Sequence, residues 1–274
     1  MLDDATLRPD PDEPLALRVA TLPAGDGEGP RLELELSSRG DRVPARVALP
    51  PTGDAPPPVV LLVHGLGGSR DAAYMQMARR WVSEGAAVAT LDLPLHGARA
   101  NAKMGERLAA SAPRALRGEP LDGVEQILWT ELARQAVLDL RRLLDALAQL
   151  PQVDATRVAY VGFSLGGLLG CALCGADPRP RAAAIAVAGT PPDGAALALS
   201  AWVERIAPRP LLFVNAERDE TIPREAALRL HAAARGPADV AWFASGHADL
   251  PGAALKRIWQ FVRAHVGLDG AEAR

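Results

Sequence analysis

One stretch constrains this sequence more than any other: Val158-Ala-Tyr-Val-Gly-Phe-Ser-Leu-Gly-Gly167. Residues 158–161 are β-branched, aromatic or small, which predicts a buried strand, whereas residues 165–176 have the apolar, small-residue composition of a packed helix. Glycines flank Ser164 on both sides of the turn between them, and glycine relieves crowding in a sharp turn. The stretch matches the G-x-S-x-G nucleophile elbow, which presents a serine hydroxyl above a sheet. A serine that only caps the helix is the alternative.

Strand-like and helix-like segments alternate along the rest of the chain. Partial apolar and polar alternation predicts antiparallel strands at residues 15–21, 31–37 and 42–49. A continuous apolar run, typical of a strand covered on both faces, follows at residues 59–63. Further strands are predicted at residues 86–91, 183–188, 210–215 and 239–243. Helices are predicted at residues 72–84, 129–150, 224–234 and 255–266. This order predicts an α/β fold: a mostly parallel central sheet with helices on both faces and an antiparallel N-terminal edge.

The length favours one domain, residues 15–274, with two special segments. Residues 1–14 are acidic and contain prolines without periodicity, so we expect a flexible or loosely held leader. Residues 98–126 lose periodicity and contain several glycines and prolines, which predicts a small cap insertion without one long helix. Within it, Leu108 and Leu116 are apolar enough to line a substrate pocket.

Composition narrows the class of ligand. The 274 residues are 49% hydrophobic, enough for a large core, and the net charge of −3 leaves no basic excess for nucleic acid or an anionic membrane. The start of the chain has no signal-peptide pattern and no apolar run is long enough to span a bilayer, so we expect a cytoplasmic protein. Cys171 and Cys174 lie in one predicted helix with no second Cys/His pair, so buried thiols are expected rather than a redox pair or a zinc site.

A serine is a weak nucleophile until a base takes its proton, so the elbow requires a histidine and an acid. Asp219 follows the strand at 210–215, and His247 follows the last strand, which gives the order Ser, Asp, His that accompanies this elbow. Glu217 and Glu220 are the alternative acids. Ser164, Asp219 and His247 are therefore the candidate catalytic residues.

The elbow, the His64-Gly-Leu-Gly-Gly68 loop and the loops that carry the acid and the histidine resemble the α/β-hydrolase superfamily over nearly the whole chain. Asp92-Leu-Pro-Leu-His-Gly97 and Asp154-Ala-Thr-Arg-Val158 resemble its esterase, dienelactone hydrolase and prolyl oligopeptidase-like branch. The sequence departs from many relatives at Asn215-Ala216, where His-Gly is common, and at Phe163, where His, Tyr or Gln is common.

The resemblance implies further site residues. The backbone N–H groups of Leu66 and Leu165 would form the oxyanion hole. Phe163 is expected to shape the acyl pocket, and His64 is placed beside the substrate, holding the oxyanion loop rather than taking a proton. His96 is expected to support the adjoining loop.

These residues predict a serine hydrolase that cleaves a carboxylic ester of a small molecule through an acyl-enzyme, a carboxylesterase without metal or organic cofactor. A thioesterase, an amidase or peptidase, and an acyltransferase would use the same triad. A non-catalytic binding protein on a hydrolase fold is the alternative from another class. The sequence leaves the substrate and the oligomeric state open.

Overall fold

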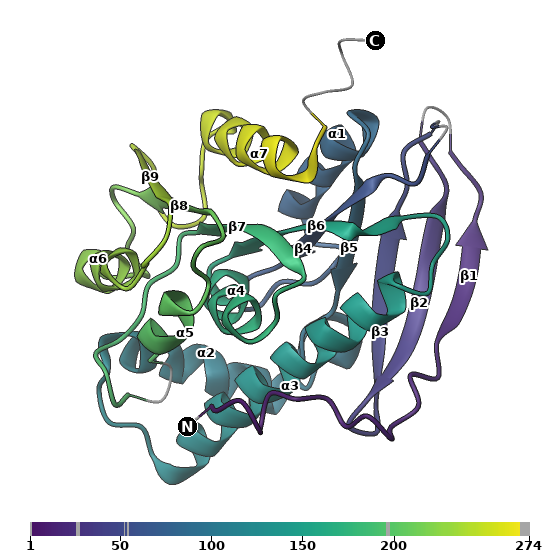
Figure 1. The fold of residues 1–274 in the computed structure, drawn as a ribbon. Coiled ribbons are helices and arrows are strands. Elements are labelled where there is room, and N and C mark those ends of the chain that lie inside the picture. The colour runs from purple at the N-terminus through teal and green to yellow at the C-terminus, as the bar shows by residue number, and fades with distance from the viewer. Residues whose placement is uncertain (1, 26–27, 52, 54, 196–197, 269–274) are drawn as a thin grey trace.

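The computed structural model describes residues 2–25, 28–51, 53, 55–195 and 198–268, which form an α/β fold (Figure 1). Its nine strands are β1 (Arg18–Leu22), β2 (Arg31–Ser38), β3 (Asp41–Ala48), β4 (Pro58–Val63), β5 (Ala87–Leu91), β6 (Asp154–Phe163), β7 (Pro180–Ala186), β8 (Leu211–Ala216) and β9 (Ala238–Phe243). The helices are η1 (Ala73–Met77), α1 (Ala78–Ser83), η2 (Gly97–Arg99), α2 (Ala102–Arg117), α3 (Gly123–Leu147), α4 (Leu165–Ala176), α5 (Ser200–Glu204), α6 (Arg224–Ala232) and α7 (Gly252–Val266).

The strands form one sheet in the order β1-β2-β3-β5-β4-β6-β7-β8-β9. The pairs that join β1, β2, β3 and β5 are antiparallel, and all pairs from β5 to β9 are parallel. Buried and less buried residues alternate along β2 and β3, whereas β4 and β5 are buried throughout, as expected for strands that are covered on both faces. The predicted sheet, with its antiparallel N-terminal edge, is confirmed.

Two hydrophobic layers cover the sheet. One is formed with α2 to α6 and contains the side chains of Leu61, Val158 and Tyr160. The other is formed with α1 and α7 and contains Val60 and Leu62, because successive residues of a strand point to opposite faces. Figure 1 shows α3 and α4 on one side of the sheet and α7 on the other. The central strands are thereby shielded from water on both faces.

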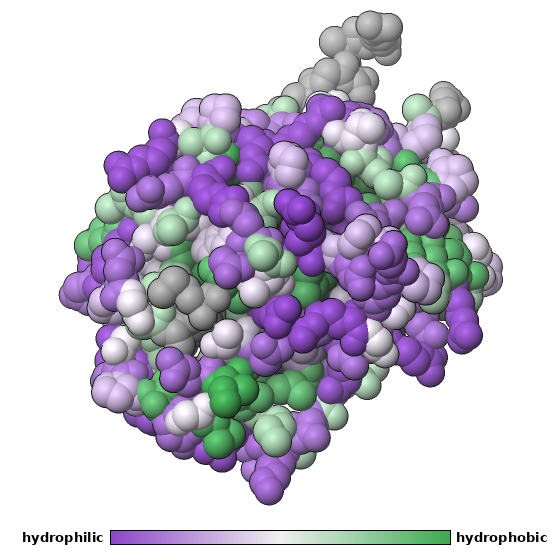
Figure 2. Space-filling model, turned by 60° about the horizontal axis from the view of Figure 1, so that its bottom comes forward, coloured by the Kyte–Doolittle hydropathy of each residue, from purple (hydrophilic) through white to green (hydrophobic). Residues whose placement is uncertain are grey.

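The outer surface carries few large apolar side chains. Hydrophilic side chains cover much of the face shown in Figure 2. In the described part of the chain, the exposed large apolar residues are Val19, Leu22, Val124, Ile127, Leu228 and Val240. None of the described helices combines the length and the apolar composition that crossing a membrane requires.

The N-terminal segment differs from the expected loose leader, apart from Met1, which lies outside the described residues. Leu7 is completely buried in the layer that contains α3. Arg134 and Arg141 of α3 donate hydrogen bonds to the carbonyl oxygens of Thr6 and Leu7, at 3.1 and 2.7 Å. The buried leucine and these hydrogen bonds attach the segment to the domain. The composition of the segment does not predict this attachment.

The segment 98–126 also differs from expectation, because its centre is the 16-residue helix α2. The Asn101 side chain accepts a hydrogen bond from the N–H of Met104 at its start, and Gly118 ends it with a left-handed φ of 71°. Leu108, Ala112, Ala115 and Leu116 are buried and share one face at helical spacing. This packing outweighs the helix-breaking tendency of Gly105 and Pro113, so the prediction that no long helix forms here was wrong.

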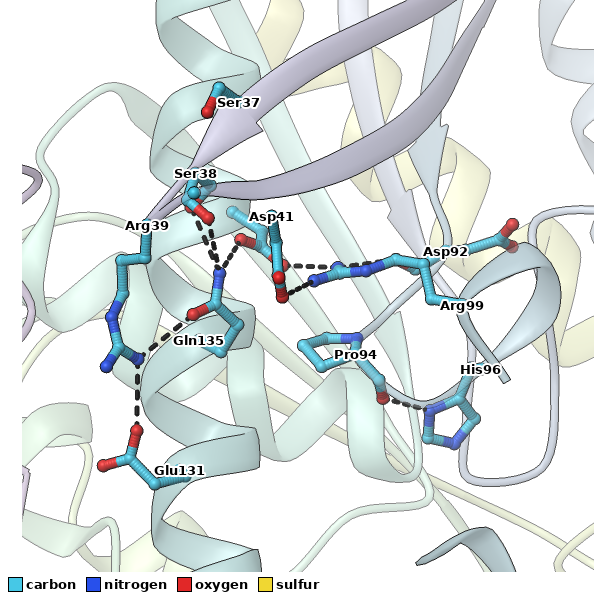
Figure 3. Close-up of polar contacts among 12 residues, drawn as sticks. Ser37, Ser38, Arg39, Asp41, Asp92, Pro94, His96, Arg99, Glu131 and Gln135 are labelled. Atoms are coloured by element: carbon cyan, nitrogen blue, oxygen red, sulfur yellow. Dashed lines mark hydrogen bonds and ion pairs between the residues drawn. The ribbon is translucent and has the colours of Figure 1, made fainter. Parts of the chain in front are cut away.

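Buried polar contacts attach the start of this segment to the domain (Figure 3). Arg99 donates hydrogen bonds to the Asp139 carboxylate at 2.6 Å and to the Asp92 carbonyl oxygen at 3.3 Å. Asp139 is fully buried in α3, and Gln135, one turn earlier, donates to its other oxygen at 2.7 Å. A second nitrogen of Arg99 donates to Asp41 of β3 at 3.1 Å. The loop after β5 is thus held against both α3 and β3.

Candidate active site

Ser164 lies in a sharp turn between β6 and α4. Its φ of 52° and ψ of −113° are strained for a residue with a Cβ atom. A Cβ at Gly162 would lie 2.4 Å from the carbonyl oxygen of Gly166, and one at Gly166 would lie 2.4 Å from that of Val63. Only glycine fits at both positions, so the spacing of the G-x-S-x-G motif follows from close backbone packing.

Three side chains that lie far apart in the sequence meet at this turn. The Nε2 atom of His247 is 3.0 Å from the Oγ atom of Ser164. The Nδ1 atom of His247 is 2.9 and 3.0 Å from the two carboxylate oxygens of Asp219. A carboxylate only accepts, so Nδ1–H donates to it and Nε2 is left to accept from the serine hydroxyl. This is the geometry of a serine, a base and the group that orients the base.

The loop after β8 determines which acid faces the imidazole. The Asp219 carboxylate accepts hydrogen bonds from the backbone N–H groups of Thr221 and Ile222 at 2.9 and 2.7 Å, which fix its orientation. Glu217 and Glu220 are exposed instead. Glu220 accepts a hydrogen bond from the backbone N–H of His247 at 3.3 Å. Of the three candidate acids, Asp219 lies against the imidazole.

The loop after β4 lies directly against the elbow. A Cβ at Gly65 would be 3.2 Å from the Cβ of Ser164. The N–H of Gly68 donates to the carbonyl oxygen of Gly65 at 3.1 Å, which closes a tight turn that contains Leu66. Leu165 is the first residue of α4, where N–H groups have no partner within the helix. The predicted donors, Leu66 and Leu165, thus lie in a turn that packs against Ser164 and in the residue that directly follows it.

His64 is not at the substrate-facing position predicted for it. It is completely buried, its Nδ1–H donates to the Gly65 carbonyl oxygen at 2.8 Å, and its Nε2 accepts from the N–H of Leu93 at 3.2 Å. Burial lowers the pKa of His64 to about 4, so the ring is neutral near pH 7. It joins the loops after β4 and β5, in line with its expected role in holding the oxyanion loop.

A related arrangement surrounds His96. Its Nδ1–H donates to the Pro94 carbonyl oxygen at 2.8 Å, and burial lowers its pKa. Asp92 is nearly completely buried and accepts hydrogen bonds from the N–H groups of Arg70 and Ala98 at 2.9 and 3.0 Å. Sequence reasoning did not single out Asp92 as a loop-binding residue. The signal was present, because a carboxylate directly follows a buried strand.

The other three residues predicted to contact substrate lie in hydrophobic layers. Leu108 is 0% and Leu116 7% exposed, and both belong to the layer around α3. Phe163 is 7% exposed and belongs to the layer on the opposite face of the sheet. The structure therefore places these side chains in the core rather than along an open pocket. Apolar character alone does not distinguish a residue that lines a substrate pocket from one that is buried in the core.

The polar side chains in the described part of the chain do not form a site for a metal ion: no group of three or more His, Cys, Asp or Glu is suitably placed there. Cys171 and Cys174 are free and buried. Burial raises the pKa of the Cys174 thiol to about 12 and that of Cys171 further. Since the thiolate is the reactive and metal-binding form, both cysteines are packing residues.

A cavity of about 500 Å³ lies elsewhere, between the sheet and the η1–α1 segment, and none of the triad residues lines it. Its floor includes Leu62 and Val88, and its rim carries several arginines. Carboxylates compensate most of these charges through the pairs Arg46–Glu33, Arg46–Asp71, Arg79–Glu28 and Arg80–Glu84. Ser164, Asp219 and His247 therefore lie outside this cavity.

Comparisons with known proteins place this chain in a family. The model of the acetyl xylan esterase family (AXE1) matches residues 33–189, more than half of the chain. No curated protein matches the sequence significantly.

Solved structures share the fold at low sequence identity. An acetyl xylan esterase from Paenibacillus sp. R4 is 20% identical with a TM-score of 0.74, covering 95% of this chain and 91% of that one. Acetyl xylan esterase 1 from Thermoanaerobacterium sp. is 16% identical with a TM-score of 0.74, covering 97% and 92%. A putative dienelactone hydrolase from Klebsiella pneumoniae is 19% identical with a TM-score of 0.61, covering 93% and 99%. The chain belongs to the acetyl xylan esterase family of the α/β-hydrolase superfamily and is a serine carboxylesterase.

Proposed function

We propose that Ser164 is the nucleophile, His247 the general base and Asp219 the residue that orients the base. The observation that carries this proposal is the continuous chain of contacts, 3.0 Å from Ser164 Oγ to His247 Nε2 and 2.9 Å from His247 Nδ1 to Asp219. Each contact lies within hydrogen-bonding distance, and the order of the three groups matches a proton path from hydroxyl to imidazole.

In the first half of the reaction, Ser164 Oγ attacks the ester carbonyl carbon while its proton moves to His247 Nε2. The tetrahedral oxyanion accepts hydrogen bonds from the N–H groups of Leu66 and Leu165, the proposed oxyanion hole. The C–O bond to the alcohol then breaks, and His247 returns the proton to the leaving oxygen. Asp219 stabilises the imidazolium without taking its proton.

In the second half, water replaces the alcohol. His247 takes one proton from water, whose oxygen attacks the acyl carbon and forms a second oxyanion at the same donors. The bond to Ser164 Oγ breaks, the proton returns to the serine, and the carboxylic acid leaves. No step requires a cofactor.

The substrate we propose is an acetyl ester of a carbohydrate. Support comes from the family model and from two structural neighbours, whose names specify acetyl xylan esterases. The acyl group would be small and the alcohol a sugar hydroxyl. Thioester, amide and alcohol-transfer chemistry use the same triad and serve as comparison reactions.

We further propose that residues 98–126 act as a small cap on a single domain. A Cβ at Gly118, which ends α2, would lie 2.7 Å from Pro192 in the loop after β7. The active groups of a mostly parallel sheet lie at the carboxyl ends of its strands, so α2 approaches that end of the sheet. With Leu108 and Leu116 facing the core, the cap would act by covering the site rather than through these two side chains.

The test combines labelling and turnover. A fluorophosphonate probe, located by peptide mapping, should modify Ser164, and Ser164→Ala should retain the circular dichroism spectrum while losing labelling and esterase activity. Acetate release from acetylated xylo-oligosaccharides should exceed hydrolysis of an acetyl thioester and of acetanilide. Label on another serine would contradict the nucleophile assignment. A preference for the thioester, or for transfer to an alcohol in place of water, would replace the proposed reaction with one of its alternatives.

A further inference from the structure

Tyr160 is a buried polar side chain that the proposed reaction does not use. It lies in β6, four residues before Ser164, and is 0% exposed. Its side chain belongs to the layer that also contains the residues of α4, so it lies between the central strand and the helix that follows the nucleophile. Figure 1 shows α4 directly beside β6.

The phenol of Tyr160 contacts the first turn of α4. Its O–H donates a 2.5 Å hydrogen bond to the carbonyl oxygen of Gly166, two residues after Ser164. This carbonyl is also at the right position to accept the helical bond from Gly170. Burial raises the pKa of the phenol well above its usual value, so the hydroxyl keeps the proton that it donates.

Two glycines make room for the aromatic ring. A Cβ at Gly170 would lie 2.1 Å from Tyr160 Cε1, and a Cβ at Gly162 would lie 2.7 Å from the same atom. Gly170 is outside the G-x-S-x-G motif, and its close contact with the ring explains a glycine in the interior of a helix, where glycine is otherwise unfavourable. The ring is thus closely confined by backbone on two sides.

Gly166 also packs against the end of β4. A Cβ at Gly166 would lie 2.4 Å from the Val63 carbonyl oxygen and 2.7 Å from that of His64, where the loop of Leu66 begins. Gly166 therefore contacts both the Tyr160 hydroxyl, through its carbonyl oxygen, and the end of β4, where the oxyanion loop begins. A shift of Gly166 would change the distance between the two proposed donors, Leu66 N–H and Leu165 N–H.

We propose that Tyr160 is a positioning residue that sets the spacing of the oxyanion hole by holding Gly166 against the end of β4. This inference rests on the proposed function. Donors stabilise an oxyanion well only within a narrow range of distances, about 2.7 to 3.1 Å, so a displacement of a few tenths of an ångström slows acyl transfer. Substrate binding before the reaction involves other contacts and is less affected.

The test is Tyr160→Phe, which removes the hydroxyl and keeps the ring. With p-nitrophenyl acetate, kcat should fall about tenfold while KM changes less than about twofold, because small displacements of reacting groups chiefly affect the transition state. The rate of fluorophosphonate labelling at Ser164 should fall in parallel. Ser38→Ala is the matched control, since it also removes a buried hydroxyl but lies in the β2–β3 hairpin, and its kcat should equal that of the wild type.

Gly170→Ala provides a second variant, because the added methyl group would displace the same ring. Its kcat should also fall, and the double variant with Tyr160→Phe should be no slower than Gly170→Ala alone, since both changes act on one contact. Wild-type kcat in a folded Tyr160→Phe protein whose Ser164 is labelled at the normal rate would overturn the inference and leave the triad proposal intact. Failure of the wild-type protein to label at Ser164 would instead overturn the proposed function.

Discussion

The Nδ1 atom of His247 lies 2.9 Å from a carboxylate oxygen of Asp219, although the two residues are 28 positions apart in the chain. Side-chain exposures of 16% and 8% show that both groups are largely removed from water. An imidazolium formed during catalysis would therefore face a fixed carboxylate in a partly desolvated site, where it is stabilised more than in water.

Asp219→Asn should lower kcat by about 10⁴-fold, because an amide favours the wrong imidazole tautomer. The expected result depends on orientation rather than charge alone, so Glu217→Gln and Glu220→Gln are matched controls that remove one nearby charge each. Both should stay within about threefold of the wild type. A severe loss in either glutamate variant, with a nearly normal Asp219→Asn enzyme, would reassign the acid. Steady-state hydrolysis of p-nitrophenyl acetate measures all three.

Gly65→Ala should impair the reaction from the opposite side of the elbow. The added methyl group would lie 3.2 Å from the Cβ of Ser164, a residue already held at a strained φ of 52°, so neither side can readily move. We expect kcat/KM to fall about tenfold or more, as displaced reacting groups lose rate steeply.

Gly105→Ala is the control for this substitution. Gly105 lies inside α2, with nothing within 4 Å of an added Cβ, so alanine there should leave kcat/KM unchanged and raise the free energy of unfolding by about 1 kcal/mol. Equal activity of the Gly65→Ala and wild-type enzymes would mean that the loop after β4 is farther from the reacting atoms than the structure indicates.

The sequence allows prediction of the sheet and the elbow because both depend on local patterns. Apolar runs and alternation identify the strands, and Gly162 and Gly166 are required by close backbone packing around Ser164. The order of serine, aspartate and histidine then follows from the order of strand ends. Prediction from local patterns succeeded where the periodicity of a single segment determines its own structure.

Predictions failed where contacts with residues distant in the sequence determine the local structure. Gly105 and Pro113 weaken a local helix signal, yet burial of Leu108 against the core maintains α2. His64 begins the loop that packs against the elbow, yet its side chain joins two loops instead of facing the substrate. The role of Tyr160 depends on Gly170, ten residues later and across the elbow, and no single-segment pattern reveals that contact.

Leu108→Ala should reduce stability and leave selectivity unchanged. Since the side chain is completely buried, its truncation should lower the free energy of unfolding by about 2 to 5 kcal/mol, measured by urea denaturation. The ratio of kcat/KM for acetyl and butyryl p-nitrophenyl esters should equal that of the wild type. Val124→Ala, at an exposed position near the start of α3, is the control for stability. A changed ratio of kcat/KM for the two esters in Leu108→Ala would mean that this leucine lines the substrate pocket after all.

The last prediction concerns stability in mild acid, where His64 favours the unfolded chain. Its pKa is lowered from 6.5 to about 4 in the folded protein, so below pH 6.5 the unfolded chain binds a proton that the folded protein does not. The contribution of His64 to the free energy of unfolding should therefore be largest above pH 6.5 and fall as the pH approaches 4. At 1.4 kcal/mol per pH unit, the total loss for this residue is about 3 kcal/mol.

Burial lowers the pKa of His231 to about 4 as well. His231 therefore also makes the free energy of unfolding fall as the pH falls below 6.5. His64→Asn isolates the contribution of His64, because asparagine supplies one donor and one acceptor without titrating. This variant should be less stable than the wild type at pH 7.5 and lose less further stability by pH 5. Urea denaturation at the two pH values measures the difference, and an unchanged pH dependence in His64→Asn would show that His64 is not held neutral by its burial between the loops after β4 and β5.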